Sequence, residues 1–144
     1  MVGRLGSCVI YGTGSQESEG AMHLFKGINV VSLTVSDLAR AKVFYSEVLG
    51  LVTPVYDMPE IGWIEWRTGN DANVAVTLAQ TSFSPSIHTT VVFNVDDCHA
   101  AVAALRNRNV LCDEPIGVPG VVTDASFYDP DGNRLQMCSA PPAA

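Results

Sequence analysis

The chain has 144 residues, of which 47% are hydrophobic and 16% are charged. This composition indicates a globular protein with its own core and excludes a disordered chain. The formal net charge of −7, without any run of lysine or arginine, argues against partners such as nucleic acid or an acidic membrane surface. No apolar run approaches the roughly 18–20 residues that span a bilayer. The four cysteines show no CxxC pair and no zinc-like spacing, which favours reduced thiols in a cytoplasmic protein.

The first 21 residues differ in composition from the rest of the chain. They are rich in glycine and serine and show no hydrophobic period, so we expect a flexible N-terminal extension over residues 1–21. An ordered arm that adds to the edge of a sheet is the alternative. A single domain is expected over residues 22–140, followed by a short tail at residues 141–144.

The domain begins with the pattern of a strand, a helix and three further strands. Apolar residues alternate along residues 30–35, which predicts a strand, and Ser36 or Asp37 suits the N-cap of the helix that follows. Apolar residues at helical spacing continue to Gly50, where the helix is expected to end. Three strands are predicted next, at Leu51–Tyr56, Gly62–Arg67 and Asn73–Ala79.

The same pattern then begins again. Val35-Ser36-Asp37-Leu38 is followed 60 residues later (95 − 35) by Val95-Asp96-Asp97-Cys98, and each motif lies between a predicted strand and a predicted helix. This internal repeat predicts an α+β fold. Two βαβββ modules, about residues 26–80 and 88–139, would form a curved mixed sheet around a concave cavity, with the helices outside. The last three strands are expected around Leu111–Val118, Val121–Tyr128 and Arg134–Ser139.

Asp129-Pro130-Asp131-Gly132 predicts the turn of a hairpin near the C-terminus. Pro130 fixes φ, the aspartate side chains can bond nearby backbone amides, and Gly132 can take a positive φ. In the strand that follows, alternation places Arg134 and Gln136 on one face.

Two segments resemble the vicinal oxygen chelate superfamily, which includes glyoxalase I, the bleomycin resistance proteins and the extradiol dioxygenases. Residues 28–51 are similar to the first strand and helix of that family, and residues 127–137, with the turn above, are similar to its terminal hairpin. Gly62-Trp63-Ile64-Glu65-Trp66 is similar to a third strand common in small bacterial members. The resemblance implies the fold given above and a homodimer that closes the cavity. It does not decide the function, because the superfamily hosts several chemistries on one scaffold.

Members of this family that use a metal carry four inward-facing ligands, typically His or Gln, then Glu or His, then His, then Glu. Aligned on the motifs, these positions fall on Val30, Thr77, Thr90 and Gln136. Valine has no donor atom, and threonine hydroxyls and an amide oxygen are weak ligands for Zn, Ni or Fe. We therefore expect no cofactor. A divalent metal would require a different alignment, with His88 as a displaced ligand.

Strand alternation predicts which side chains line the cavity. They include an aromatic ring, hydroxyl groups, amides and one carboxylate, which suits a small organic ligand with several hydrogen-bonding groups. The predicted lining is Val30, Ser32, Thr34, Trp63, Glu65, Thr77, His88, Thr90, Asn94 and Gln136. Arg67 is expected to face the same side.

Glu65 and His88 are the candidate catalytic residues. A carboxylate on a half-buried strand can act as a general base, and His88 is the histidine placed closest to the predicted cavity. The alternatives without chemistry are an ion pair between Glu65 and Arg67, or a contact at the dimer seam, and an exposed His88 in the linker before the strand.

Three functions follow from these residues. The first is a metal-free protein that binds or sequesters an organic compound, in the manner of bleomycin resistance proteins, and the missing ligands favour it. The second is a metal-dependent lyase, isomerase or dioxygenase of the glyoxalase I or extradiol type. The third is a metal-independent acid/base enzyme that uses Glu65 with His88.

Overall fold

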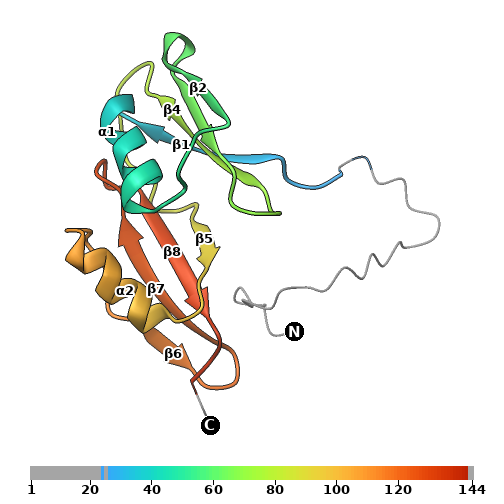
Figure 1. The fold of residues 1–144 in the computed structure, drawn as a ribbon, viewed down its shortest axis with the longest axis vertical. Coiled ribbons are helices and arrows are strands. Elements are labelled where there is room, and N and C mark those ends of the chain that lie inside the picture. The colour runs from blue at the N-terminus through green and yellow to red at the C-terminus, as the bar shows by residue number, and fades with distance from the viewer. Residues whose placement is uncertain (1–23, 25, 143–144) are drawn as a thin grey trace.

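A computed structural model describes residues 24 and 26–142, so the predicted extension at residues 1–21 lies outside the described residues. Each half of the chain forms its own four-stranded mixed sheet (Figure 1). The first sheet has the order β1-β4-β3-β2, from β1 (Val30–Val35), β2 (Tyr56–Met58), β3 (Trp63–Trp66) and β4 (Asn73–Leu78). The second has the order β5-β8-β7-β6, from β5 (Val91–Asn94), β6 (Ile116–Val118), β7 (Val122–Tyr128) and β8 (Arg134–Ser139).

The two sheets have the same topology. β1 pairs parallel with β4 and β5 pairs parallel with β8, while the remaining pairs are antiparallel. Each sheet therefore belongs to one βαβββ module, and the predicted α+β fold with two modules is confirmed.

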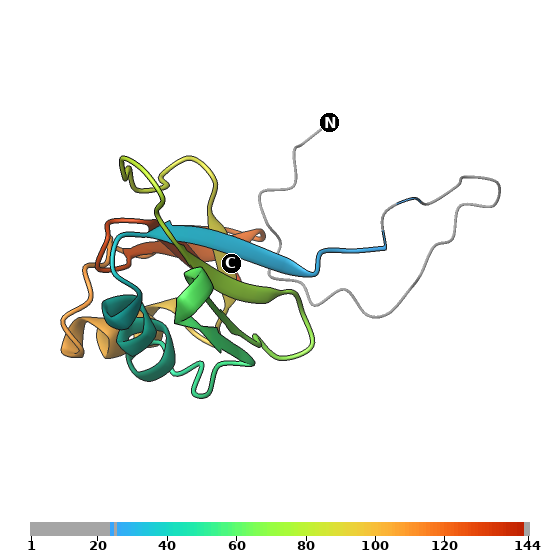
Figure 2. The ribbon, with the colours of Figure 1, turned by 90° about the horizontal axis from the view of Figure 1, so that it is seen from above.

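Each module carries one helix after its first strand. α1 (Leu38–Val43) continues into a π-helical turn at Phe44–Val48, and α2 spans Cys98–Asn107. A short 3-10 turn at Pro59–Ile61 joins β2 to β3. Figures 1 and 2 show both long helices on the same flank of the molecule.

The two helices begin in the same way, as the repeat predicts. The Asp37 side chain accepts a hydrogen bond from the Arg40 amide at 2.9 Å. The Asp97 side chain accepts hydrogen bonds from the amides of His99 and Ala100 at 2.8 and 3.2 Å. Both caps have extended backbone, at φ −145° and −148°. Asp37 rather than Ser36 is therefore the first cap.

One hydrophobic core runs through both modules. From the first module it includes Leu33, Tyr45 and Trp66, and from the second Val102 and Leu135. The rings of Tyr45 and Trp66 stack with centroids 5.3 Å apart. Because the buried cluster is continuous, the two modules share one core.

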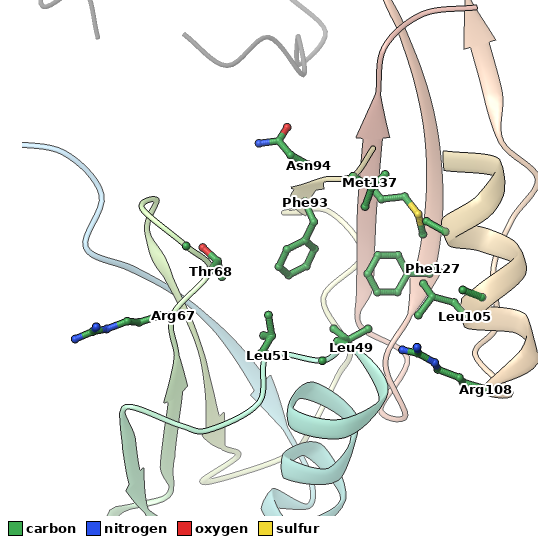
Figure 3. A pocket seen from close by; sticks show the side chains of 15 residues that line it. Leu49, Leu51, Arg67, Thr68, Phe93, Asn94, Leu105, Arg108, Phe127 and Met137 are labelled. Carbon is green, nitrogen blue, oxygen red and sulfur yellow. The ribbon is translucent and has the colours of Figure 1, made fainter. Parts of the chain in front are cut away.

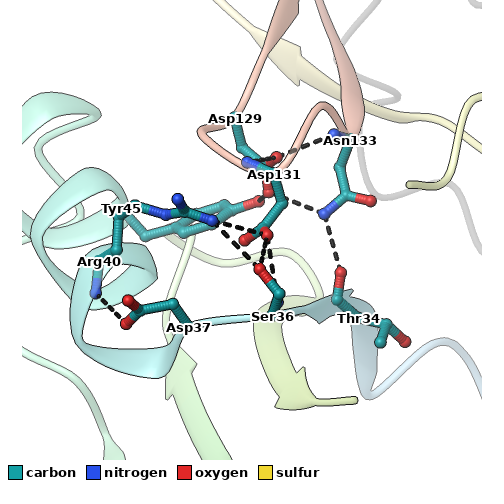
Figure 4. Close-up of polar contacts among 8 residues, drawn as sticks. All are labelled: Thr34, Ser36, Asp37, Arg40, Tyr45, Asp129, Asp131 and Asn133. Atoms are coloured by element: carbon teal, nitrogen blue, oxygen red, sulfur yellow. Dashed lines mark hydrogen bonds and ion pairs between the residues drawn. The ribbon is translucent and has the colours of Figure 1, made fainter. Parts of the chain in front are cut away.

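A buried polar network also joins the modules, through the turn that the sequence marks as a hairpin (Figure 4). The Asp129 carboxylate accepts a hydrogen bond from the Tyr45 hydroxyl at 3.0 Å and from the Asn133 amide at 2.9 Å. The same Asn133 amide nitrogen donates to the Thr34 carbonyl at 2.9 Å. Asn133 and Asp129 are 0% and 5% exposed, so these bonds lie within the interior, where an unpaired polar group would be costly.

Two predicted strands are shorter than expected. The strand predicted at Leu51–Tyr56 is wrong, because only Tyr56 of this range belongs to β2. Val52 has a left-handed backbone with φ 64°, and Pro54 lacks an amide hydrogen, so neither can extend the ladder. Similarly, of the range Leu111–Val118, only Ile116–Val118 is a strand, preceded by Pro115.

Candidate ligand-binding faces

Each sheet packs one face against the shared core, and among the described residues the side chains of its other face lie outside that core. In β1, Leu33 and Val35 are buried toward α1, whereas Ser32 and Thr34 alternate with them and are exposed. The pairing register extends this face across the sheet. We call it the first open face, and its side chains come from Val30, Ser32, Thr34, Tyr56, Met58, Trp63, Glu65, Asn73, Ala75 and Thr77.

Glu65 lies near the centre of the first open face. Its neighbours across the sheet are Tyr56 on β2 and Ala75 on β4. The Asn73 amide donates to one carboxylate oxygen at 2.7 Å, and the Trp63 indole donates to the other at 3.1 Å. Glu65 is 6% exposed, and no cationic side chain of the described residues lies within ion-pair distance of it. Two neutral donors therefore orient a carboxylate that has no counter-charge in this part of the chain.

The second open face belongs to the other module. Pairing places Val92, Gln136 and Ser126 in one row across β5, β8 and β7. The Ser126 hydroxyl oxygen accepts hydrogen bonds from Gln136 at 3.3 Å and from Arg134 at 3.1 Å. Asn94 lies on the same face, one row away. This face thus carries amide and guanidinium donors.

The predicted lining residues fall into two groups. Eight of them project from the open faces, namely Val30, Ser32, Thr34, Trp63, Glu65, Thr77, Asn94 and Gln136. Thr90 and His88 precede β5, which begins at Val91. His88 is exposed on a bend, and the Glu65 carboxylate bonds to Trp63 and Asn73 rather than to it. A ligand-binding role for these residues stays a prediction.

Arg67 is placed differently from the prediction. β3 ends at Trp66, so Arg67 no longer follows the alternation of that strand. It is exposed and borders a cavity between the modules instead of the open face. The ion pair considered between Glu65 and Arg67 does not form, because Trp63 and Asn73 provide the contacts of the carboxylate.

The register also corrects one of the four positions at which the related enzymes bind metal. Val92 pairs with Gln136 in the second module, and its counterpart 60 residues earlier (92 − 60 = 32), Ser32, pairs with Ala75. Ala75 therefore corresponds to Gln136, and Thr77 lies two residues beyond it. The four positions become Val30, Ala75, Thr90 and Gln136.

This set does not fit a divalent metal of the family type. Two of the four side chains are hydrocarbon, and the other two offer a hydroxyl and an amide, whereas such sites use imidazole, thiolate or carboxylate. Across residues 24 and 26–142, no three His, Cys, Asp or Glu side chains converge as a metal site would require. We derive no chemical step through a metal.

Several open-face residues were missed in the sequence. Asn73 and Ala75 share the alternation of Thr77 along β4, so the period of the strand could have identified them. Tyr56 could not be found in this way, because its strand was predicted to begin at Leu51 and not at Tyr56. Ser126 required the pairing of β7 with β8, which alternation alone does not give.

Comparison with known families agrees with this topology. The profile of the Glyoxalase/Bleomycin resistance protein/Dioxygenase superfamily matches residues 27–137, which is most of the chain. The chain belongs to this superfamily. The resemblance of residues 28–51 and 127–137 to the same group is thereby confirmed.

Three similar proteins carry names that describe different functions or none. The uncharacterized protein YaeR of Escherichia coli K12 is 28% identical over 123 residues, which cover 78% of this chain and 95% of YaeR. TnmS3, an antibiotic binding protein from Streptomyces sp. CB03234, is 27% identical with a TM-score of 0.70, over 84% of this chain and 100% of TnmS3. Lactoylglutathione lyase from Agrobacterium tumefaciens has a TM-score of 0.66 at 17% identity, over 81% of this chain and 95% of the lyase, and at that identity it shows the fold alone. None of the helices in the described residues is both long and apolar enough to cross a membrane.

Proposed function

We propose that the protein binds a small organic compound without a metal ion, at a cleft lined by the open faces of its sheets. The observation that carries the proposal is the Glu65 carboxylate, which two neutral donors hold beside Ala75. At the position of Ala75, metal-dependent relatives are expected to carry a side chain that binds the metal. In this chain that position has only a methyl group, and the oriented carboxylate of Glu65 lies beside it. Similarity to an antibiotic binding protein supports the same reading.

The first open face indicates the chemistry of the ligand. Trp63 is partly buried and Tyr56 is 54% exposed, so flat ring surfaces are available for an aromatic or other planar group. Each oxygen of Glu65 accepts one hydrogen bond and retains a second lone pair. A compound with a planar apolar part and an ammonium or N–H group would satisfy both features.

A homodimer would close this cleft. The open faces carry large apolar side chains that remain in solvent in a single chain, including Tyr56 at 54%, Ile116 at 64% and Val92 at 46% exposure. Exposed apolar side chains gathered on a sheet face are typical of an interaction surface. A second copy placed against the open faces would cover these side chains.

The first test is the metal content of protein purified without chelators, measured by inductively coupled plasma mass spectrometry. We expect well below one Zn, Ni, Fe or Mn per chain. A screen of amine-bearing aromatic antibiotics by differential scanning fluorimetry should then give thermal shifts that EDTA leaves unchanged. Near-stoichiometric metal, or shifts that EDTA abolishes, would contradict the proposal and favour a metal-dependent enzyme.

Glu65→Gln tests the role of the carboxylate. The substitution keeps the shape but removes the charge, so binding of an amine-bearing hit should weaken by about tenfold, the usual scale of a charge-assisted hydrogen bond. Isothermal titration calorimetry measures the change. Glu60→Gln is the matched control, because Glu60 is exposed on the 3-10 turn before β3. Equal affinity of the wild type and Glu65→Gln would place the ligand elsewhere.

A further inference from the structure

A separate cavity lies where the two modules meet on the helix side (Figure 3). Its volume is about 500 Å³, within the range of small-molecule pockets. One wall comes from residues 49–51 and 67–69 of the first module, and the other comes from β5, α2, β7 and β8. Neither module forms this cavity alone.

The wall from the second module is apolar. Phe93, Phe127 and Met137 line it together with Leu105 of α2, and the rings of Phe93 and Phe127 have centroids 6.3 Å apart. Opposite them lie Leu49 and Leu51, as Figure 3 shows. Such a lining accommodates an aromatic ring or a short alkyl chain.

This cavity lies mainly behind the open faces, and Asn94 is the one residue named above on an open face that is also among its described lining residues. Phe93 and Met137 alternate with Asn94 and Gln136 along their strands, so they project from the opposite side of the second sheet. In Figure 3, Asn94 accordingly points away from the ring of Phe93. A ligand in this cavity would therefore not contact Glu65.

Two arginines border the cavity, and no Asp or Glu is among its described lining residues. Arg40, Lys42 and Arg106 each pair with a carboxylate elsewhere in the described chain. Arg67 and Arg108 have no such partner there, in a protein whose net charge is −7.

Arg108 is the better placed of the two. One of its terminal nitrogens donates to the Val48 carbonyl at 2.6 Å, which holds the guanidinium group beside Leu49 at the edge of the cavity (Figure 3). A guanidinium group has five N–H donors, so most of them are left for a ligand. Arg67 extends outward from the other rim and is exposed, so its side chain can turn toward an anion.

We propose that this junction cavity binds a small apolar monocarboxylate, with the ring or chain against Phe93 and Phe127 and the carboxylate on Arg108. The site differs from the open faces in the sign of its charge, because it presents a guanidinium group where the first open face presents a carboxylate. Arg67 adds a second positive charge at the rim.

The test compares 4-phenylbutyrate with 4-phenylbutanamide, which has the same shape and no charge. Isothermal titration calorimetry near pH 7 should show the acid binding about tenfold more tightly than the amide. In Arg108→Gln this preference should disappear, in Arg67→Gln it should shrink, and in Arg108→Lys it should be partly kept. Arg106→Gln is the matched control, because Arg106 lies two residues before Arg108 in the last turn of α2 and pairs with Glu114.

A second variant tests the location without relying on charge. Ala104→Trp places an indole in the cavity from the exposed surface of α2, so it should abolish binding of the acid while the circular dichroism spectrum stays unchanged. The same acid should bind Glu65→Gln as it binds the wild type. The proposal is overturned if acid and amide bind alike, if Arg106→Gln loses as much affinity as Arg108→Gln, or if folded Ala104→Trp binds normally.

Discussion

At the scale of single residues, the contact between the two modules at Asp129 keeps the Tyr45 hydroxyl protonated. The Tyr45 side chain is buried in the core and donates its hydroxyl hydrogen to Asp129. Burial first, and then the charge of Asp129, raise the pKa of Tyr45 far above its usual value near 10. The unfolded chain releases this proton near pH 10 whereas the folded protein retains it, so the free energy of unfolding falls as the pH rises above about 10.

Tyr45→Phe should distinguish two contributions of Tyr45 to stability, namely its hydrogen bond to Asp129 and its effect on the pH dependence of unfolding. Near neutral pH we expect the free energy of unfolding to drop by about 1 kcal/mol, because the Asp129 carboxylate loses one donor. Above pH 10 the variant should lose less stability than the wild type, because phenylalanine has no proton to release. Urea denaturation followed by circular dichroism, at about pH 7 and pH 10.5, measures both effects. Tyr56→Phe is the control on an exposed tyrosine, and parallel pH profiles for wild type and Tyr45→Phe would refute the argument.

At the scale of elements, the segment after the first helix is shaped by one backbone conformation. Val52 has φ 64°, in the left-handed region that a β-branched residue rarely adopts and that costs roughly 1–2 kcal/mol. Its amide donates to the Ser46 carbonyl at 3.1 Å, which ties the segment back to the π-helical turn. The side chain is 70% exposed, so little burial offsets the strain.

Val52→Asn should therefore stabilise the protein. Asparagine tolerates the left-handed region, and we expect the free energy of unfolding to rise by about 0.5–1 kcal/mol. The midpoint of urea denaturation measures the change. Thr53→Asn serves as a control at the adjacent exposed position, where the backbone φ is not positive. A lower midpoint for Val52→Asn than for Thr53→Asn would show that Val52 makes contacts that outweigh its strain.

The same element shows why parts of the fold escape sequence analysis. Alternating and helical patterns identified β1, both helices and the final hairpin, because each buries one face against the core. The predicted strand at Leu51–Tyr56 failed because valine gives no sign of a left-handed backbone. The partners of Glu65 were also missed, since Asn73 reaches it only through the pairing of β3 with β4.

At the scale of the whole molecule, the repeat made the two modules predictable but not their junction. The 60-residue offset and the two N-cap aspartates are local features of the sequence. In contrast, the bond of Arg108 to Val48 joins residues 60 positions apart, and the cavity beside it is lined by residues of both modules. No local pattern encodes either feature. The open faces were predictable in part. Strand alternation identifies the side chains that they carry, but it does not identify what covers those side chains.

The proposed dimer makes a prediction at this scale. Val92→Asp adds a charge to the second open face, so it should shift the protein from dimer to monomer in sedimentation velocity experiments at micromolar concentration. Leu111→Asp is the matched control, since Leu111 is 69% exposed and lies beside a groove near α1, away from the open faces. A wild type that is already monomeric would refute the dimer. Loss of the dimer in Leu111→Asp alone would place the interface on the helix side.

The hydrogen bonds of Asn133 have a consequence for whether the two halves of this protein can exist separately. This one buried side chain donates to Thr34 in the first module and accepts from the Ser86 amide in the linker at 2.7 Å. Either half produced alone would leave such groups without partners and would expose half of a common interior. We therefore expect the halves, cut within residues 80–87, to be unstable separately and to reassemble when mixed.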